Sequence, residues 1–153
     1  MFQLPIPNFD SEHSKGSSEL GQLPDWNLND LYTSTDAKEL VSDLSWLEKE
    51  CDEFANEYQG KLKFLSADQM LQCIIRNEKI SSISGRIISY AGLRYYQNTT
   101  NADRAKFLSD MQEKITVYTT KLVFFSLEIN SLEDAFLEGL LNENEELFRY
   151  KPV

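Results

Sequence analysis

Apolar side chains recur every three or four positions over most of the chain, which is the spacing of an amphipathic helix. The first such stretch predicts a helix from about Thr35 to Tyr58, with Asp36 in the positively polarised first turn and Gly60 ending it. One face of this helix would hold the apolar set Ala37, Leu40, Val41, Leu44, Leu47, Cys51, Phe54, Ala55 and Tyr58.

A second, longer helix is indicated after Ser66-Ala-Asp-Gln69, in which the serine and the glutamine can form a capping box. No proline interrupts the pattern from there to Gln97. A helix of about 30 residues would be ~45 Å long, whereas a compact domain of this size is only ~40 Å across. The sequence therefore predicts an elongated molecule.

The turn Asn98-Thr-Thr-Asn101 would cap a third helix that runs to about Ile129, antiparallel to the second. Its apolar positions are Phe107, Leu108, Met111, Ile115, Tyr118, Leu122 and Phe125. Residues 117–127 include strand-favouring side chains, but no turn signal separates them from the helical pattern, so we favour helix. A shorter fourth helix would start at a Ser131 cap and carry Ala135, Phe136, Leu140 and Leu141.

Residues 1–24 hold three of the four prolines and a small polar run, with no sustained apolar periodicity. We expect a flexible tail over residues 1–22 and a helical domain over 23–153. The fold class is then all-α, an elongated antiparallel hairpin or bundle of about four helices with a disordered N-terminal tail. Where the tail ends, apolar side chains concentrate in a segment expected to dock onto another surface; they are Trp26, Leu28, Leu31 and Tyr32.

The chain is acidic, with 25 Asp and Glu against 15 Lys and Arg and a formal charge of −10. Nucleic-acid binding depends on clustered cations, and no basic stripe is present, so neither nucleic acid nor an anionic membrane is an expected partner. No run of apolar residues is long enough to span a bilayer, and Met1–Asp10 does not resemble a secretory signal. We expect a cytoplasmic location.

Candidate catalytic chemistry is sparse. His13 is the one histidine, and together with Cys51 and Cys73 it cannot supply a zinc site, so no catalytic, cofactor-binding or metal-binding residue is predicted. The chain has no His-Glu-x-x-His, no glycine-rich phosphate loop and no Gly-x-Ser-x-Gly. The two cysteines are expected to be buried thiols. A solvated helix face accounts for Glu48, Glu50, Glu53 and Glu57.

Small residues line one stripe of the second helix, at Ser81, Gly85, Ser89 and Gly92. Such a stripe lets another backbone approach closely. It predicts either tight packing within the helical hairpin or a contact surface for another domain, since each glycine costs ~1 kcal/mol of helix propensity that contact must offset. The nearby Tyr90, Tyr95 and Tyr96, with Arg86 and Arg94, would form an amphipathic rim.

Four segments in this order resemble the N-terminal region of oligoendopeptidase F, a family of zinc-dependent peptidases that cleave short peptides. They are Leu23-Pro-Asp-Trp-Asn-Leu-Asn-Asp-Leu-Tyr32, the long first helix, residues 80–97 with Ser-Gly-Arg and Tyr-Ala-Gly-Leu-Arg-Tyr-Tyr, and Phe148-Arg-Tyr-Lys-Pro152. The likeness covers about residues 23–152. It implies a region that forms part of a channel wall and limits access to short, extended peptides.

In that family zinc is held by His-Glu-x-x-His and a later glutamate, and no position of this chain matches them. The resemblance therefore implies binding without chemistry: the chain itself binds no cofactor, and zinc is expected only in an absent catalytic part. The expected partners are that catalytic domain and short peptides. The chain would be a truncated product, an expressed domain or one chain of a split peptidase. The alternative is a self-sufficient helical adaptor or dimerisation module, and an oligomer is possible under either hypothesis.

Overall fold

The computed structural model describes residues 26–151, and every regular element within them is helical. The predictions for the tail, for His13 and for the last two residues lie outside this range. The helices are α1 (Lys38–Tyr58), the 3-10 helix η2 (Leu62–Phe64), α2 (Ala67–Tyr96), α3 (Ala102–Thr120), α4 (Val123–Ser131), α5 (Asp134–Glu143) and α6 (Glu145–Phe148). The predicted all-α class is confirmed.

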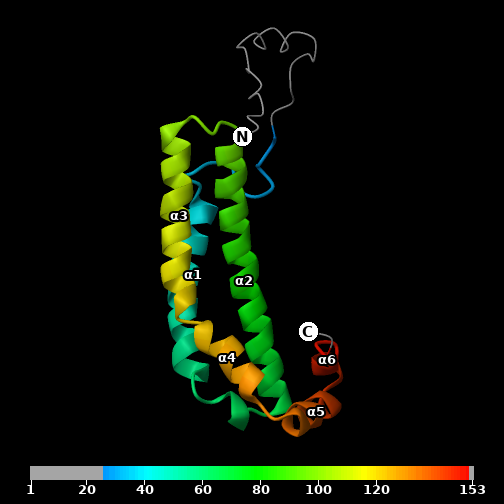
Figure 1. Ribbon diagram of the computed structural model, residues 1–153. Helices are drawn as coiled ribbons and strands as arrows, with labels where there is room; N and C mark the ends of the chain where they lie inside the picture. The colour runs from blue at the N-terminus through cyan, green and yellow to red at the C-terminus, as the bar shows by residue number, and fades with distance from the viewer. Residues whose placement is uncertain (1–25, 152–153) are drawn as a thin grey trace, which may run out of the picture.

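The three longest helices, α1, α2 and α3, lie side by side along one axis and give the molecule an elongated shape (Figure 1). α2 and α3 run antiparallel, joined by the short turn at one end of the bundle (Figure 1). α4 crosses the opposite end, and α5 and α6 lie beside the N-terminal half of α2 (Figure 1). The predicted elongated antiparallel arrangement is therefore correct.

Local signals begin α2 and α3, and end α1, where the sequence predicts. The amide of Gln69 donates to Ser66 Oγ at 3.3 Å, and the amide of Ser66 donates to Gln69 Oε1 at 3.0 Å, which completes the capping box. Asn101 caps α3 by accepting from the amide of Arg104 at 3.0 Å. After α1, Gly60 adopts φ 77°, a left-handed conformation that other residues rarely take.

The core is formed mainly where α1 and α3 pack against α2. Phe54 of α1 is fully buried, and its ring lies 5.7 Å from that of Phe125 in a T-shaped arrangement. Two sequence expectations fail here: Val41, predicted on the buried face of α1, is 55% exposed, and Tyr90, predicted on an amphipathic rim, is buried in the core. Tyr90 faces inward because Tyr32 and Phe107 pack edge-on against its ring.

The predicted third helix is wrong as a single element, because it divides into α3 and α4 at Lys121 and Leu122. The hydroxyls of Thr119 and Thr120 donate to the carbonyls of Ile115 and Thr116, a pattern that bends helices. Lys121 also forms an ion pair with Asp52 of α1. The bend directs α4 across the bundle, and it remains helical, so the strand interpretation of residues 117–127 is excluded.

The predicted fourth helix also starts elsewhere. Ser131 ends α4, and its hydroxyl donates to the carbonyl of Glu128 instead of capping a new helix. α5 begins after Glu133, whose side chain makes no capping hydrogen bond. The polar residues after it form a further short helix, α6, which Asn144 caps. The described residues thus form six α-helices, where the sequence predicts about four.

Replacing Phe54 by alanine should lower the free energy of unfolding by about 3–5 kcal/mol, because it removes a fully buried ring from the contact between α1, α2 and α4. Phe64→Ala is the matched control, since that ring is 73% exposed and should change stability by less than about 0.5 kcal/mol. Urea denaturation followed by circular dichroism measures both. Similar values for the two variants would contradict this packing.

Candidate interaction surface

The segment before α1 is attached to the bundle through Tyr32. Its ring is buried and meets the ring of Tyr90 edge-on, with centroids 5.4 Å apart. The Tyr32 hydroxyl donates to Asp43 of α1 at 2.6 Å and accepts from Arg86 Nε of α2 at 3.0 Å. Arg86 also forms an ion pair with Asp43 and lies over the Tyr32 ring. One cluster therefore joins three segments.

This environment changes the acidity of the cluster. Burial and the hydrogen bond to Asp43 raise the pKa of Tyr32 to about 12. The hydrogen bond to Asp43 raises the pKa of Arg86 above its ordinary value. The Tyr32 phenol therefore remains neutral, and the Arg86 guanidinium remains charged, over the whole physiological range.

The four residues expected to dock divide into two groups. Leu28 and Leu31 are partly buried against the core, and Tyr32 is fully covered, so these three pack within the chain itself. Trp26 is 53% exposed, and its carbonyl accepts a hydrogen bond from Gln97 at 2.9 Å. Among the four residues of this predicted interface, Trp26 is therefore the one whose side chain remains available to another molecule.

The small-residue stripe lies on the surface. Ser81, Gly85 and Ser89 are exposed, and Gly92 is half-buried. A Cβ atom added at Gly85 would meet nothing within 4 Å, and one at Gly92 would meet the Tyr96 ring at 3.9 Å. Tight packing of this stripe within the hairpin is therefore wrong. Its use as a contact surface for another molecule stays a prediction.

The same side of α2 is covered further toward its N-terminus. Three residues precede Ser81 on this side at helical spacing. Leu71 is buried, Ile74 is half-buried and Glu78 is exposed. Tyr150, just after α6, donates from its hydroxyl to Glu78 at 2.8 Å. We define the uncovered continuation of this side as the α2 open face, which consists of Ser81, Gly85, Ser89, Gly92 and Tyr96. Tyr96 at its end is 65% exposed.

A second arginine cluster, which sequence reasoning missed, holds the other half of α2 to α1. Arg76 donates to Glu50 at 2.8 Å and to Glu57 at 2.5 Å, and its guanidinium lies 5.4 Å from the centre of the Tyr58 ring. Burial alone would lower the pKa of Arg76, but the bonds to Glu50 and Glu57 outweigh it and raise that pKa. The bond to Arg76 lowers the pKa of Glu57. Glu57 is thus structural as well as solvated, whereas the solvated position predicted for Glu50 is wrong, because its side chain is 14% exposed beside Arg76.

Other groups within residues 26–151 offer no reactive site. Cys51 and Cys73 are free and buried, as predicted, and burial raises the pKa of their thiols to about 11 and about 12. No three His, Cys, Asp or Glu side chains of this range are grouped so that they could hold a metal ion. In the described part of the chain, no helix is both long and apolar enough to cross a membrane.

The chain should lose stability as pH rises from 10 to 12, and Tyr32→Phe should make this loss smaller. In the unfolded chain the phenol ionises near pH 10, whereas in the folded chain it holds its proton to about pH 12, so stability falls as pH rises through this window. Urea midpoints at pH 8, 10 and 11.5 measure the effect. Tyr96→Phe, at an exposed ring, is the control and should follow the unmodified chain; identical pH profiles for all three would refute the role of Tyr32.

Gly85→Ala should raise the free energy of unfolding by about 0.5–1 kcal/mol, because the new methyl group meets open space and alanine favours the helix. Gly60→Ala is the contrasting variant and should be destabilising, since its backbone has φ 77°. Thermal unfolding of both variants gives the comparison. A destabilising Gly85→Ala would indicate that something within the chain covers this position.

Comparison with known proteins gives one informative similarity. No family model matches the chain, and no solved structure matches it. The chain is 30% identical over 152 residues to oligopeptidase PepF of Bacillus subtilis strain 168, and the match covers 84% of the chain and 20% of the relative. The chain thus spans about one fifth of the length of this relative. Over most of its own length it is similar to part of an oligopeptidase, which confirms the resemblance to oligoendopeptidase F predicted from the sequence.

Proposed function

We propose that the chain acts as a noncatalytic helical domain of an oligoendopeptidase F-like zinc metallopeptidase. The observation that carries the proposal is the similarity to oligopeptidase PepF over 84% of the chain, in a sequence that has no His-Glu-x-x-His. In this role the elongated bundle forms part of the wall around a peptide channel and limits entry to short peptides. Zinc and the general base belong to a separate catalytic part.

The α2 open face and Trp26 are the proposed contacts with that catalytic part. The α2 open face has small side chains that allow a second backbone to approach closely, and it continues a side of α2 against which α5 and α6 already pack. Tyr96 and Trp26, both more than half exposed, supply aromatic area of the kind that anchors interfaces. A cytoplasmic location remains an expectation that accompanies this proposal.

The purified chain should contain no stoichiometric zinc and should not cleave a quenched fluorescent heptapeptide. Inductively coupled plasma mass spectrometry and a fluorimetric assay give the two readouts, with oligopeptidase PepF of Bacillus subtilis as the positive control. Zinc bound one to one together with turnover that a chelator abolishes would refute the noncatalytic assignment.

A helical adaptor that dimerises through the α2 open face is the second candidate, favoured by the exposure of that face. Sedimentation and binding of an apolar dye distinguish the two candidates. A domain that lacks its partner should be a monomer that binds the dye, whereas the adaptor should be a stable dimer that binds little dye. Gly85→Leu should disrupt the dimer, because it fills the face. Gly139→Leu is the matched control on α5, where a Cβ atom also meets nothing within 4 Å.

A further inference from the structure

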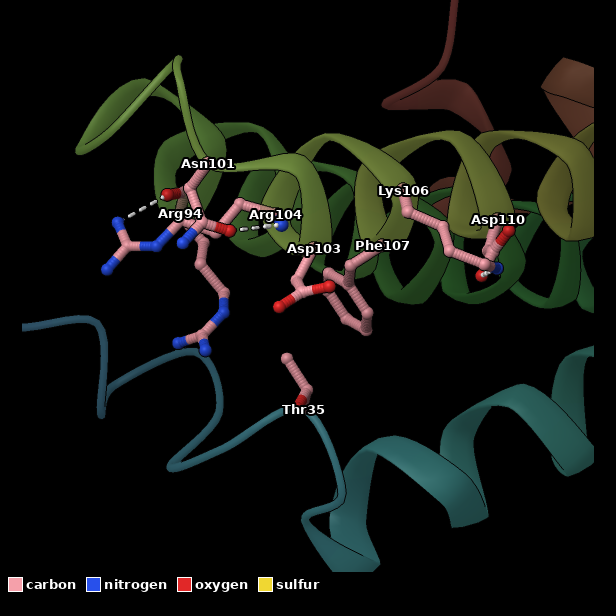
Figure 2. Close-up of a pocket in the computed structure, with 8 residues that line it drawn as sticks. All are labelled: Thr35, Arg94, Asn101, Asp103, Arg104, Lys106, Phe107 and Asp110. Carbon is pink, nitrogen blue, oxygen red and sulfur yellow. Dashed lines mark hydrogen bonds and ion pairs between the residues drawn. The ribbon is translucent and has the colours of Figure 1, made fainter.

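A pocket of about 470 Å³ lies where α2 ends and α3 begins (Figure 2). Arg94 of α2 and Arg104 and Phe107 of α3 line it, and Thr35, from the segment that leads into α1, lies opposite (Figure 2). The remaining lining residues are Asn101, Asp103, Lys106 and Asp110. Arg94 follows Gly92 by two positions, about 200° around the helix, so this pocket is separate from the α2 open face.

Most polar groups of the pocket already have partners. Lys106 forms an ion pair with Asp110 at 2.5 Å, and the amide of Arg104 is bound to the Asn101 side chain. Arg104 Nη1 donates to the carbonyl of Arg94 at 2.9 Å, which holds the Arg104 guanidinium beside the end of α2. The guanidinium of Arg94 is the exception: among residues 26–151 it makes no ion pair and no hydrogen bond, although Arg94 is half-buried.

Three cations and two carboxylates line the pocket, so it carries a net positive charge in a chain whose formal charge is −10. The Arg94 guanidinium, which has no partner among the described residues, is the cation of this pocket best able to bind an anion. A guanidinium matches the two oxygens of a carboxylate in a bidentate geometry. Asp103, in the same wall, opposes a doubly charged ligand such as phosphate more strongly than a singly charged one.

We propose that this pocket is a binding site for a single carboxylate, held by the guanidinium of Arg94 with its carbon chain against Phe107, while Arg104 adds positive charge to the pocket. The carboxylate belongs either to the C-terminus of a short peptide or to an acidic side chain of another protein surface. The site does not depend on the proposed peptidase role, because its geometry is complete within the described residues.

The test is a titration of the ¹⁵N-labelled full chain, at constant ionic strength, followed by the arginine Nε–Hε signals. The probes are acetylglycine, which carries a terminal carboxylate, acetylglutamate amide, which carries a side-chain carboxylate, and neutral acetylglutamine amide. We expect saturable shifts at Arg94 with the two carboxylates and none with the neutral probe. Tighter binding of acetylglycine would assign the site to peptide termini, and tighter binding of acetylglutamate amide to acidic side chains.

Arg94→Gln should weaken carboxylate binding about tenfold, the effect of losing one charge-assisted hydrogen bond. Arg149→Gln is the matched control, because it removes the same charge from an exposed position after α6 and should leave affinity unchanged. Should Arg94→Gln fail to fold, Arg94→Lys keeps the charge, loses the bidentate fork and should still weaken binding. The proposal would be overturned by the absence of saturable shifts, by equal losses in the Arg94 and Arg149 variants, or by equal binding of the neutral probe. Inorganic phosphate, titrated in the same way, would also overturn it by binding more tightly than the carboxylates.

Discussion

The burial of α2 against its neighbours is the interaction on which the rest of the structure depends. α1, α3, α5 and α6 all pack against this one helix. A helix of 30 residues cannot be stable in water on propensity alone when it contains Gly85 and Gly92, so its stability must come from apolar contacts along its length. Ile80, Ile87 and Tyr90 supply the centre of that contact, and each is nearly or completely buried.

Two arginines on α2 determine how α1 lies against it. Arg76 and Arg86 are ten residues apart, and they reach Glu50 with Glu57 and Asp43 respectively. Both clusters include a tyrosine whose ring is buried, so the charged groups are paired at the edge of the core where water is partly excluded. Because such pairs lose hydration when they form, we expect them to specify the register of α1 against α2 more than they add stability. Because Tyr32 joins the Arg86 cluster, the same contact also fixes the path of the chain into α1.

The side of α2 away from α3 is covered by other helices over only part of its length. α5 and α6 pack along the N-terminal part of α2, where Tyr150 reaches Glu78. Further along, the same side carries small residues and ends in an exposed tyrosine. A face that is small, continuous with an existing helix contact and flanked by exposed aromatic rings is typical of a surface that another helix covers.

The sequence by itself determined the all-α class, the elongated antiparallel arrangement and the caps at Ser66 and Asn101, because helical periodicity and capping are local effects of neighbouring residues. It also determined the resemblance to oligoendopeptidase F, through the order and spacing of several segments. Only the tertiary structure decided the break between α3 and α4, since it depends on threonine hydroxyls bonding backward and on Lys121 meeting Asp52 across the bundle. The exposure of the small-residue stripe and the bond from Arg104 to the Arg94 carbonyl were likewise decided in three dimensions. Periodicity indicates which residues share a helix face but not which faces the neighbouring helices cover.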